Sequence, residues 1–186
     1  MKRTKLKDRI LPKYSKGEEI FNMTSHIVGG ALGIVALILC VVFAAIHHNG
    51  YGVVSGAIYG VTMILLYTMS SIYHGLKPER FSKKVFQVLD HCSIFLLIAG
   101  SYTPFCLCTF REYNTALGWT IFGIIWAIAI LGIVYLIVRM YLENDAMIKA
   151  RYLAKEYMEE KKQEILQRLT NWEGEEKIKK FRQYLD

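Results

Sequence analysis

The sequence is poor in proline and cysteine, with three and four residues respectively among 186. Proline is the residue that most strongly interrupts helices, so its scarcity leaves long stretches free to be helical. The cysteines lie in or at the edge of apolar stretches and do not suggest the disulfide framework of a small secreted domain. Charge is also missing from long stretches of the chain. Four runs of 19 to 24 residues lack Lys, Arg, Asp and Glu: Ile27–Ile46, Tyr51–Tyr73, Cys92–Phe110 and Thr115–Val138.

Each of these runs is long enough to cross a membrane, because about 20 helical residues span the ~30 Å hydrocarbon core. A soluble protein of this length would not need four of them. We therefore expect an all-α, multi-pass bundle of four transmembrane helices over residues 18–138, followed by a charged soluble helix over residues 139–186. The first run follows a polar leader and precedes three more spans, so we do not expect a cleaved signal peptide.

The net charge of +7 is distributed unevenly along the chain. Residues 1–19 hold seven basic and three acidic residues, and Lys77–Lys84 holds four basic and one acidic. The loops around His47–Tyr51 and Arg111–Asn114 have no net charge. Because Lys and Arg near membrane ends mark the cytoplasmic side, we expect a cell-membrane protein with both termini in the cytoplasm. Residues 1–17 would then form a basic cytoplasmic leader, and the tail would be cytoplasmic too.

A sequence pI of about 9.2 would also suit nucleic-acid binding. Basic residues that flank membrane spans explain it better, so we expect the lipid bilayer and no nucleic acid as the partner.

Two rows of glycines predict faces for close helix packing, because small residues let helix backbones approach in a membrane. The rows are Gly29, Gly30 and Gly33 in the first helix and Gly52, Gly56 and Gly60 in the second.

Polar residues that can carry chemistry gather at one end of the first two predicted helices. Glu19, Asn22 and His26 are spaced i, i+3 and i+7 and so share one helix face. Ser70 and His74 are four residues apart at the end of the second helix and also share a face. An ionisable group in a membrane helix is costly and should face the bundle interior, where it finds a partner.

Asp90 lies about two turns into the third helix, which runs antiparallel to the second. We therefore expect His26, His74 and Asp90 at a similar depth. Imidazole and carboxylate groups suit zinc, and a catalytic zinc usually has three protein ligands and a water. The alternative is a hydrogen-bonded cluster that locks three helices together without a metal. From the residues alone, the metal-free cluster is the favoured reading.

Other candidate ligands have simpler explanations. His91 follows Asp90 on a different helix face and suits packing, and His47 and His48 fall in a distant loop, where we expect them to be solvated. Cys106 and Cys108 are spaced like a metal pair, but small packing residues are the expected role.

Three linked motifs resemble the haemolysin III family, which is grouped with the progestin and adipoQ receptors. They are Glu19-x-x-Asn22-x-x-Ser25-His26, Ser70-x-x-Tyr73-His74, and Asp90-His91 followed by Gly100-x-Tyr102-Thr103-Pro104. The resemblance covers roughly residues 15–138 of the printed sequence.

The resemblance implies a seven-helix bundle with a zinc site near the cytoplasmic face. In the family the Ser-x-x-x-His of the second helix, an Asp of the third and a late His-x-x-x-His form that site. Ser70, His74 and Asp90 match the first two parts, but no histidine follows His91. We therefore expect a partial version of the fold, without the last three helices. Zinc would be a cofactor only of an incomplete site, with His26 as a further ligand and Glu19 and Asn22 supporting it.

Three functions remain open at this point. The first is the family's membrane-permeabilising, pore-forming or cytolytic activity, which four helices could provide only as a homo-oligomer. The second is zinc-dependent hydrolysis of lipid amides within the membrane, as in the receptor branch. The third is an inactive truncated family member or a scaffold. The incomplete ligand set weighs against an enzyme.

Overall fold

The computed structural model describes residue 6 and residues 9–172 and 175–185. Seven residues of the predicted basic leader, 1–5, 7 and 8, lie outside this described part. The chain divides into two compact units, one that ends at Tyr141 and one that begins at Leu142. Each is described by itself below.

The expected all-α membrane fold is confirmed, and every regular element in the described residues is helical. Four helical stretches are long and apolar enough to cross a membrane. The elements are α1 (Lys16–Ile46), α2 (Gly50–Gly75), α3 (Phe81–Pro104), the π-helix η2 (Phe105–Phe110), α4 (Arg111–Tyr113), α5 (Thr115–Trp172) and α6 (Glu175–Leu185).

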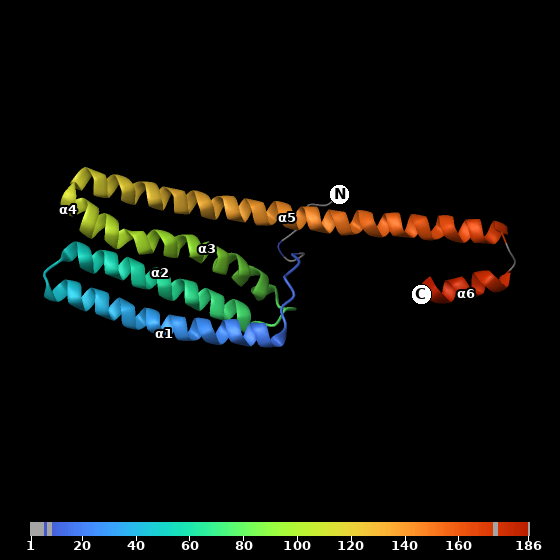
Figure 1. Ribbon diagram of the computed structural model, residues 1–186, viewed down its shortest axis with the longest axis horizontal. Coiled ribbons are helices and arrows are strands. Elements are labelled where there is room, and N and C mark those ends of the chain that lie inside the picture. The colour runs from blue at the N-terminus through green and yellow to red at the C-terminus, as the bar shows by residue number, and fades with distance from the viewer. Residues whose placement is uncertain (1–5, 7–8, 173–174, 186) are drawn as a thin grey trace. The chain divides into compact units, whose positions relative to one another are not determined.

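Short polar residues fix where the first two helices begin. Ser15 and Glu18 form a reciprocal capping box at the start of α1: the Ser15 N–H donates to the Glu18 carboxylate at 2.7 Å, and the Glu18 N–H donates to the Ser15 hydroxyl at 3.3 Å. The side chain of Asn49 caps α2 by accepting from the N–H of Gly52 at 2.8 Å. The α1–α2 connection is therefore only three residues long, which makes the two helices antiparallel neighbours (Figure 1).

The predicted close packing at glycines is confirmed, and it lies between α1 and α2. A Cβ added to Gly60 would lie 2.6 Å from the Cβ and 2.8 Å from the Cα of Leu37, and one added to Gly56 would lie 2.9 Å from the Cβ of Cys40. These distances are too short for any side chain, so only glycine allows this approach of the two backbones.

The third helix packs on α2, and α5 packs on α3. A Cβ on Gly100 of α3 would lie 2.1 Å from the hydroxyl oxygen of Thr62 on α2. The indole N–H of Trp126 on α5 donates to the hydroxyl of Thr103 on α3 at 3.2 Å, and Thr103 is buried. The first unit is thus a bundle in which successive helices are neighbours (Figure 1).

Pro104 lies where the third helix changes its geometry. In the structure Pro104 is the last residue of α3, and the helix then continues as the wider π-helix η2 before α4. Proline lacks an N–H and crowds the preceding turn, and a wider turn is one way to relieve this without ending the span.

The tail differs from the expectation in one respect. We predicted a transmembrane helix that ends near Val138 and a separate soluble helix, but α5 continues without interruption to Trp172. The sequence explains this, because neither glycine nor proline occurs between Gly132 and Gly174. Ion pairs at helical spacing support the charged half, such as Lys149–Asp145 at 2.5 Å and Arg168–Glu164 at 2.8 Å.

The glycine packing gives a prediction with an internal control. Gly60→Val should disrupt the α1–α2 contact, because the new side chain would overlap the backbone of Leu37. Overpacking of this kind costs about 1–3 kcal/mol. Gly123→Val introduces the same side chain in α5, where nothing lies within 4 Å of the new Cβ. Thermal unfolding in detergent should show a clear loss of stability for the first variant only, and equal losses would contradict this packing.

Candidate functional site

A cluster of charged side chains joins α1, α2 and α3 at the end of the bundle where α1 begins, which we call the polar end. The Glu19 carboxylate of α1 contacts two partners, one through each oxygen. Its Oε2 lies 2.7 Å from the Nδ1 of His74 on α2, and its Oε1 accepts from the ammonium of Lys83 on α3 at 2.6 Å. We call these three residues the Glu19 cluster.

The helix termini place these side chains. Glu19 lies in the first turn of α1, where its N–H bonds the carbonyl of Ser15 at 3.1 Å. His74 lies in the last turn of α2, and Lys83 in the first turn of α3. Only Leu76–Arg80 separates α2 from α3, so three helix ends meet within a few ångströms.

Lys83 is the most buried member of the cluster, with 2% of its side chain exposed. Besides Glu19, its ammonium donates to the carbonyl of Leu76 at 2.9 Å and lies 5.0 Å from the ring centroid of Tyr73. Leu76 is the C-cap of α2, so the cation also sits at the negative end of that helix dipole. A buried ammonium with two oxygen partners and an aromatic neighbour is well compensated.

Sequence reasoning missed Lys83, which it treated only as one of the basic residues of Lys77–Lys84. The signal was nevertheless present, because Lys83, Gln87 and Asp90 are spaced i, i+4 and i+7 and form a polar face on an otherwise apolar helix. Gln87 is buried as well.

His26 lies beside the cluster. Its ring centroid is 5.9 Å from that of His74 and 5.8 Å from that of Tyr67. The Nδ1 atom of His26 is buried and has no hydrogen-bond partner among the described residues. A buried nitrogen without a hydrogen-bond partner is unusual, and it makes this position a candidate for binding a ligand or a proton.

Asp90 completes the polar end. Its side chain is 14% exposed, and one carboxylate oxygen lies 3.4 Å from the Nδ1 of its neighbour His91. Ser70, His26 and His74 all lie near enough to the Asp90 carboxylate to interact with it electrostatically. His26, His74 and Asp90, which we expected at a similar depth, thus lie close enough for their charges to interact.

Glu19 has partners other than the expected one. We expected Glu19 and Asn22 to support His26. Glu19 instead contacts His74 and Lys83, whereas support of His26 by the Asn22 side chain stays a prediction.

The cluster supplies part of the donor set that zinc requires. A Glu19 carboxylate that accepts from the Nδ1–H of His74 leaves Nε2 of the neutral ring free, and metal-bound histidines usually have this arrangement. Asp90 and His26 are the nearest further donors. Across residues 9–172 and 175–185, however, no three His, Cys, Asp or Glu side chains are grouped closely enough to hold a metal ion. The residues described here therefore do not form a complete zinc site.

The remaining candidates lie elsewhere. His47 and His48 are exposed in the α1–α2 turn, at the opposite end of the bundle, which we call the loop end. All four cysteines are free: Cys106 is buried, and the sulfur of Cys108 lies 3.5 Å from the hydroxyl of Ser55.

Together, the apolar helices, the glycine contacts and the charged polar end define a polytopic helical membrane protein. Its bundle positions ionisable groups near one membrane surface. The sequence comparisons identify the family within this class.

A family model described as "Haemolysin-III related" matches residues 14–156. The chain belongs to this family, as the motifs predicted.

It is 44% identical over 132 residues to a protein named Hemolysin-3 from Bacillus cereus, which covers 70% of this chain and 58% of that protein. It is 39% identical over 118 residues to a Hemolysin-3 homolog from Bacillus subtilis (strain 168), which covers 63% of this chain and 54% of that protein. The chain thus matches little more than half the length of each relative. No solved structure matches it.

Proposed function

We propose that this chain permeabilises membranes and that it does so as a homo-oligomer. The observation that carries the proposal is its 44% identity over 132 residues to a protein named Hemolysin-3. Because the chain spans 58% of that relative, the activity is proposed here for the bundle of residues 16–141.

The geometry of the bundle explains why an oligomer is required. Its interior is filled by packed side chains, among them Tyr73, Ala99, Cys106 and Leu107, each at most 3% exposed. By contrast, only 6% of the most apolar 18-residue stretch of α1 is buried, and the same share holds for that of α5. A passage for solutes would therefore form between copies, with these outer faces in contact, rather than through one copy.

Leakage from vesicles tests this proposal. The purified chain should release an encapsulated dye from phospholipid vesicles, and the initial rate should rise with more than the first power of the protein-to-lipid ratio. Vesicles that receive detergent alone or heat-denatured chain provide the controls. Absence of leakage from vesicles shown to contain the inserted protein, or a strictly linear dependence, would overturn the oligomeric mechanism.

Zinc-dependent hydrolysis of lipid amides is the second candidate, and the Glu19–His74 hydrogen bond favours it. That bond orients the imidazole as a second-shell carboxylate does in zinc enzymes. The donors beyond His74 are fewer than a catalytic zinc normally has. We therefore propose that zinc binds weakly here, and that the chain does not hydrolyse amides.

Metal analysis separates these two candidates. Purified chain dialysed against a mild chelator should retain well under one zinc per chain and should not cleave ceramide or a related amide. The result that would reverse this choice is stoichiometric zinc that survives dialysis, disappears in His74→Ala and persists in His47→Ala, which changes an exposed histidine at the loop end. A chain that neither causes vesicle leakage nor binds zinc would instead agree with the role of a scaffold.

For the orientation, we propose that the polar end and both termini face the cytoplasm. The support is the charge pattern, because Lys77–Lys84 lies at the polar end whereas the loops at the other end carry no net charge. An alkaline phosphatase fused after Asp186 in a Gram-negative host should be inactive. The same reporter inserted after His48 should be active, and the reverse pattern would invert the orientation.

A further inference from the structure

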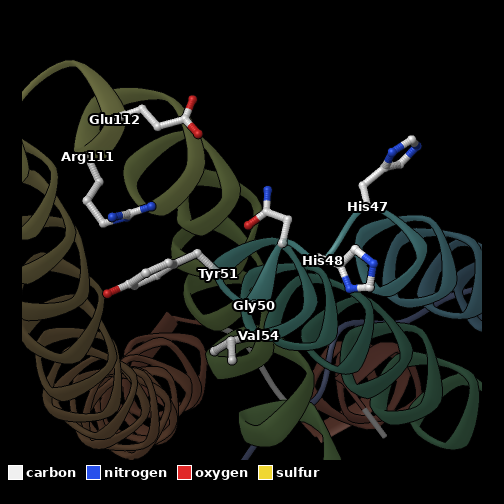
Figure 2. A pocket seen from close by; sticks show the side chains of 8 residues that line it. His47, His48, Gly50, Tyr51, Val54, Arg111 and Glu112 are labelled. Carbon is white, nitrogen blue, oxygen red and sulfur yellow. The ribbon is translucent and has the colours of Figure 1, made fainter.

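An open pocket of about 780 Å³ lies at the loop end, away from the Glu19 cluster. The α1–α2 turn, the first turn of α2 and the short helix α4 form its walls. Its polar lining residues are His47, His48, Asn49, Arg111 and Glu112. Figure 2 shows Arg111 and Tyr51 on one side of the pocket and the two histidines on the other.

The pocket lies at the depth of lipid headgroups. Helix α2 has 26 residues, which corresponds to a length of about 39 Å, and this exceeds the ~30 Å hydrocarbon core. The first turn of α2, which lines the pocket, therefore reaches the interfacial layer. Trp119 and Tyr51 contact each other edge to face nearby, at 6.4 Å between ring centroids, and such aromatic residues are typical of membrane interfaces.

Arg111 is held in place before any ligand binds. Its Nε donates to the carbonyl of Leu107 at 2.8 Å, and its guanidinium carbon lies 3.6 Å from the ring centroid of Tyr51. Behind it, a Cβ on Gly118 would lie 2.6 Å from the Arg111 backbone, so α5 fixes the position of that backbone. Stacking of this kind orients a guanidinium and leaves its edge available for paired hydrogen bonds to an oxyanion.

Among the described residues, neither charged side chain of the pocket has an oppositely charged partner. Within residues 9–172 and 175–185, neither the terminal nitrogens of Arg111 nor the carboxylate of Glu112 makes an ion pair or a hydrogen bond. The two are adjacent in sequence but do not pair with each other. One unpaired cation and one unpaired anion thus line the same pocket (Figure 2).

We propose that this pocket binds the headgroup of an amine-bearing zwitterionic phospholipid, of the phosphatidylethanolamine type. Arg111 binds the phosphodiester through paired N–H groups of its planar guanidinium, and Glu112 accepts hydrogen bonds from the primary ammonium. The exposed His47 and His48 line the far side. A purely anionic headgroup suits the site less well because Glu112 repels it, and a quaternary ammonium has no N–H to donate.

Lipid binding to the full chain tests the proposal. Native mass spectrometry of the chain with equal amounts of phosphatidylethanolamine, phosphatidylcholine and phosphatidylglycerol should show a preference for phosphatidylethanolamine. Arg111→Gln should weaken that binding at least fivefold. The matched control Lys77→Gln removes an exposed cation at the polar end and should leave it unchanged.

A second variant keeps the test decisive if Arg111→Gln unfolds the chain. Glu112→Gln changes an exposed side chain and should abolish the preference for phosphatidylethanolamine over phosphatidylcholine, whereas Glu79→Gln at the polar end should not. Phosphatidylethanolamine binding unaffected by Glu112→Gln would overturn the proposal. So would a wild-type preference for phosphatidylglycerol, or complete displacement of the lipid by millimolar inorganic phosphate.

Discussion

The carboxylate of Glu19 accepts from two helices at once, and the arrangement of the polar end depends on this. One oxygen is 2.7 Å from His74 and the other 2.6 Å from Lys83, so a single side chain of α1 ties together the end of α2 and the start of α3. Removing one partner from a buried ion pair leaves an uncompensated charge, which costs about 3–5 kcal/mol. The cluster therefore constrains the register of three helices more strongly than apolar contacts would, since lipid competes for those.

The two ends of the bundle serve different purposes in this account. At the polar end the charges of Glu19 and Lys83 satisfy each other, whereas buried polar atoms of His26, Tyr73 and Gln87 have no hydrogen-bond partner among the described residues. At the loop end, Arg111 and Glu112 line an open pocket, where we propose that a lipid headgroup binds.

Much of the fold could be predicted from the sequence, because helix length and the absence of charge are strong signals in a membrane protein. The four spans and the glycine contacts at Gly56 and Gly60 followed directly from spacing. The continuous helix α5 did not, because the change in composition at Arg139 suggested a boundary that no glycine or proline marks. The π-helix after Pro104 depends on local relief of crowding, which spacing does not encode.

The candidate site could be predicted only in part. Helix periodicity brought His26, His74 and Asp90 to one end, but it could not assign partners, because periodicity within one helix does not show which side chains of the neighbouring helices face Glu19. Lys83 was missed because a lysine near a helix start usually faces solvent, whereas this one is buried against Tyr73 and the end of α2.

A double-mutant cycle between Glu19→Gln and Lys83→Met tests the central claim most directly. Unfolding of the two single variants and the double variant would be followed in mixtures of detergent and SDS. If Glu19 and Lys83 form the buried pair, each single substitution lowers the free energy of unfolding. The double variant then loses less stability than the sum of the two single losses, with a coupling free energy of about 2 kcal/mol or more. Additive losses, with no coupling, would show that the two side chains do not interact in the folded protein.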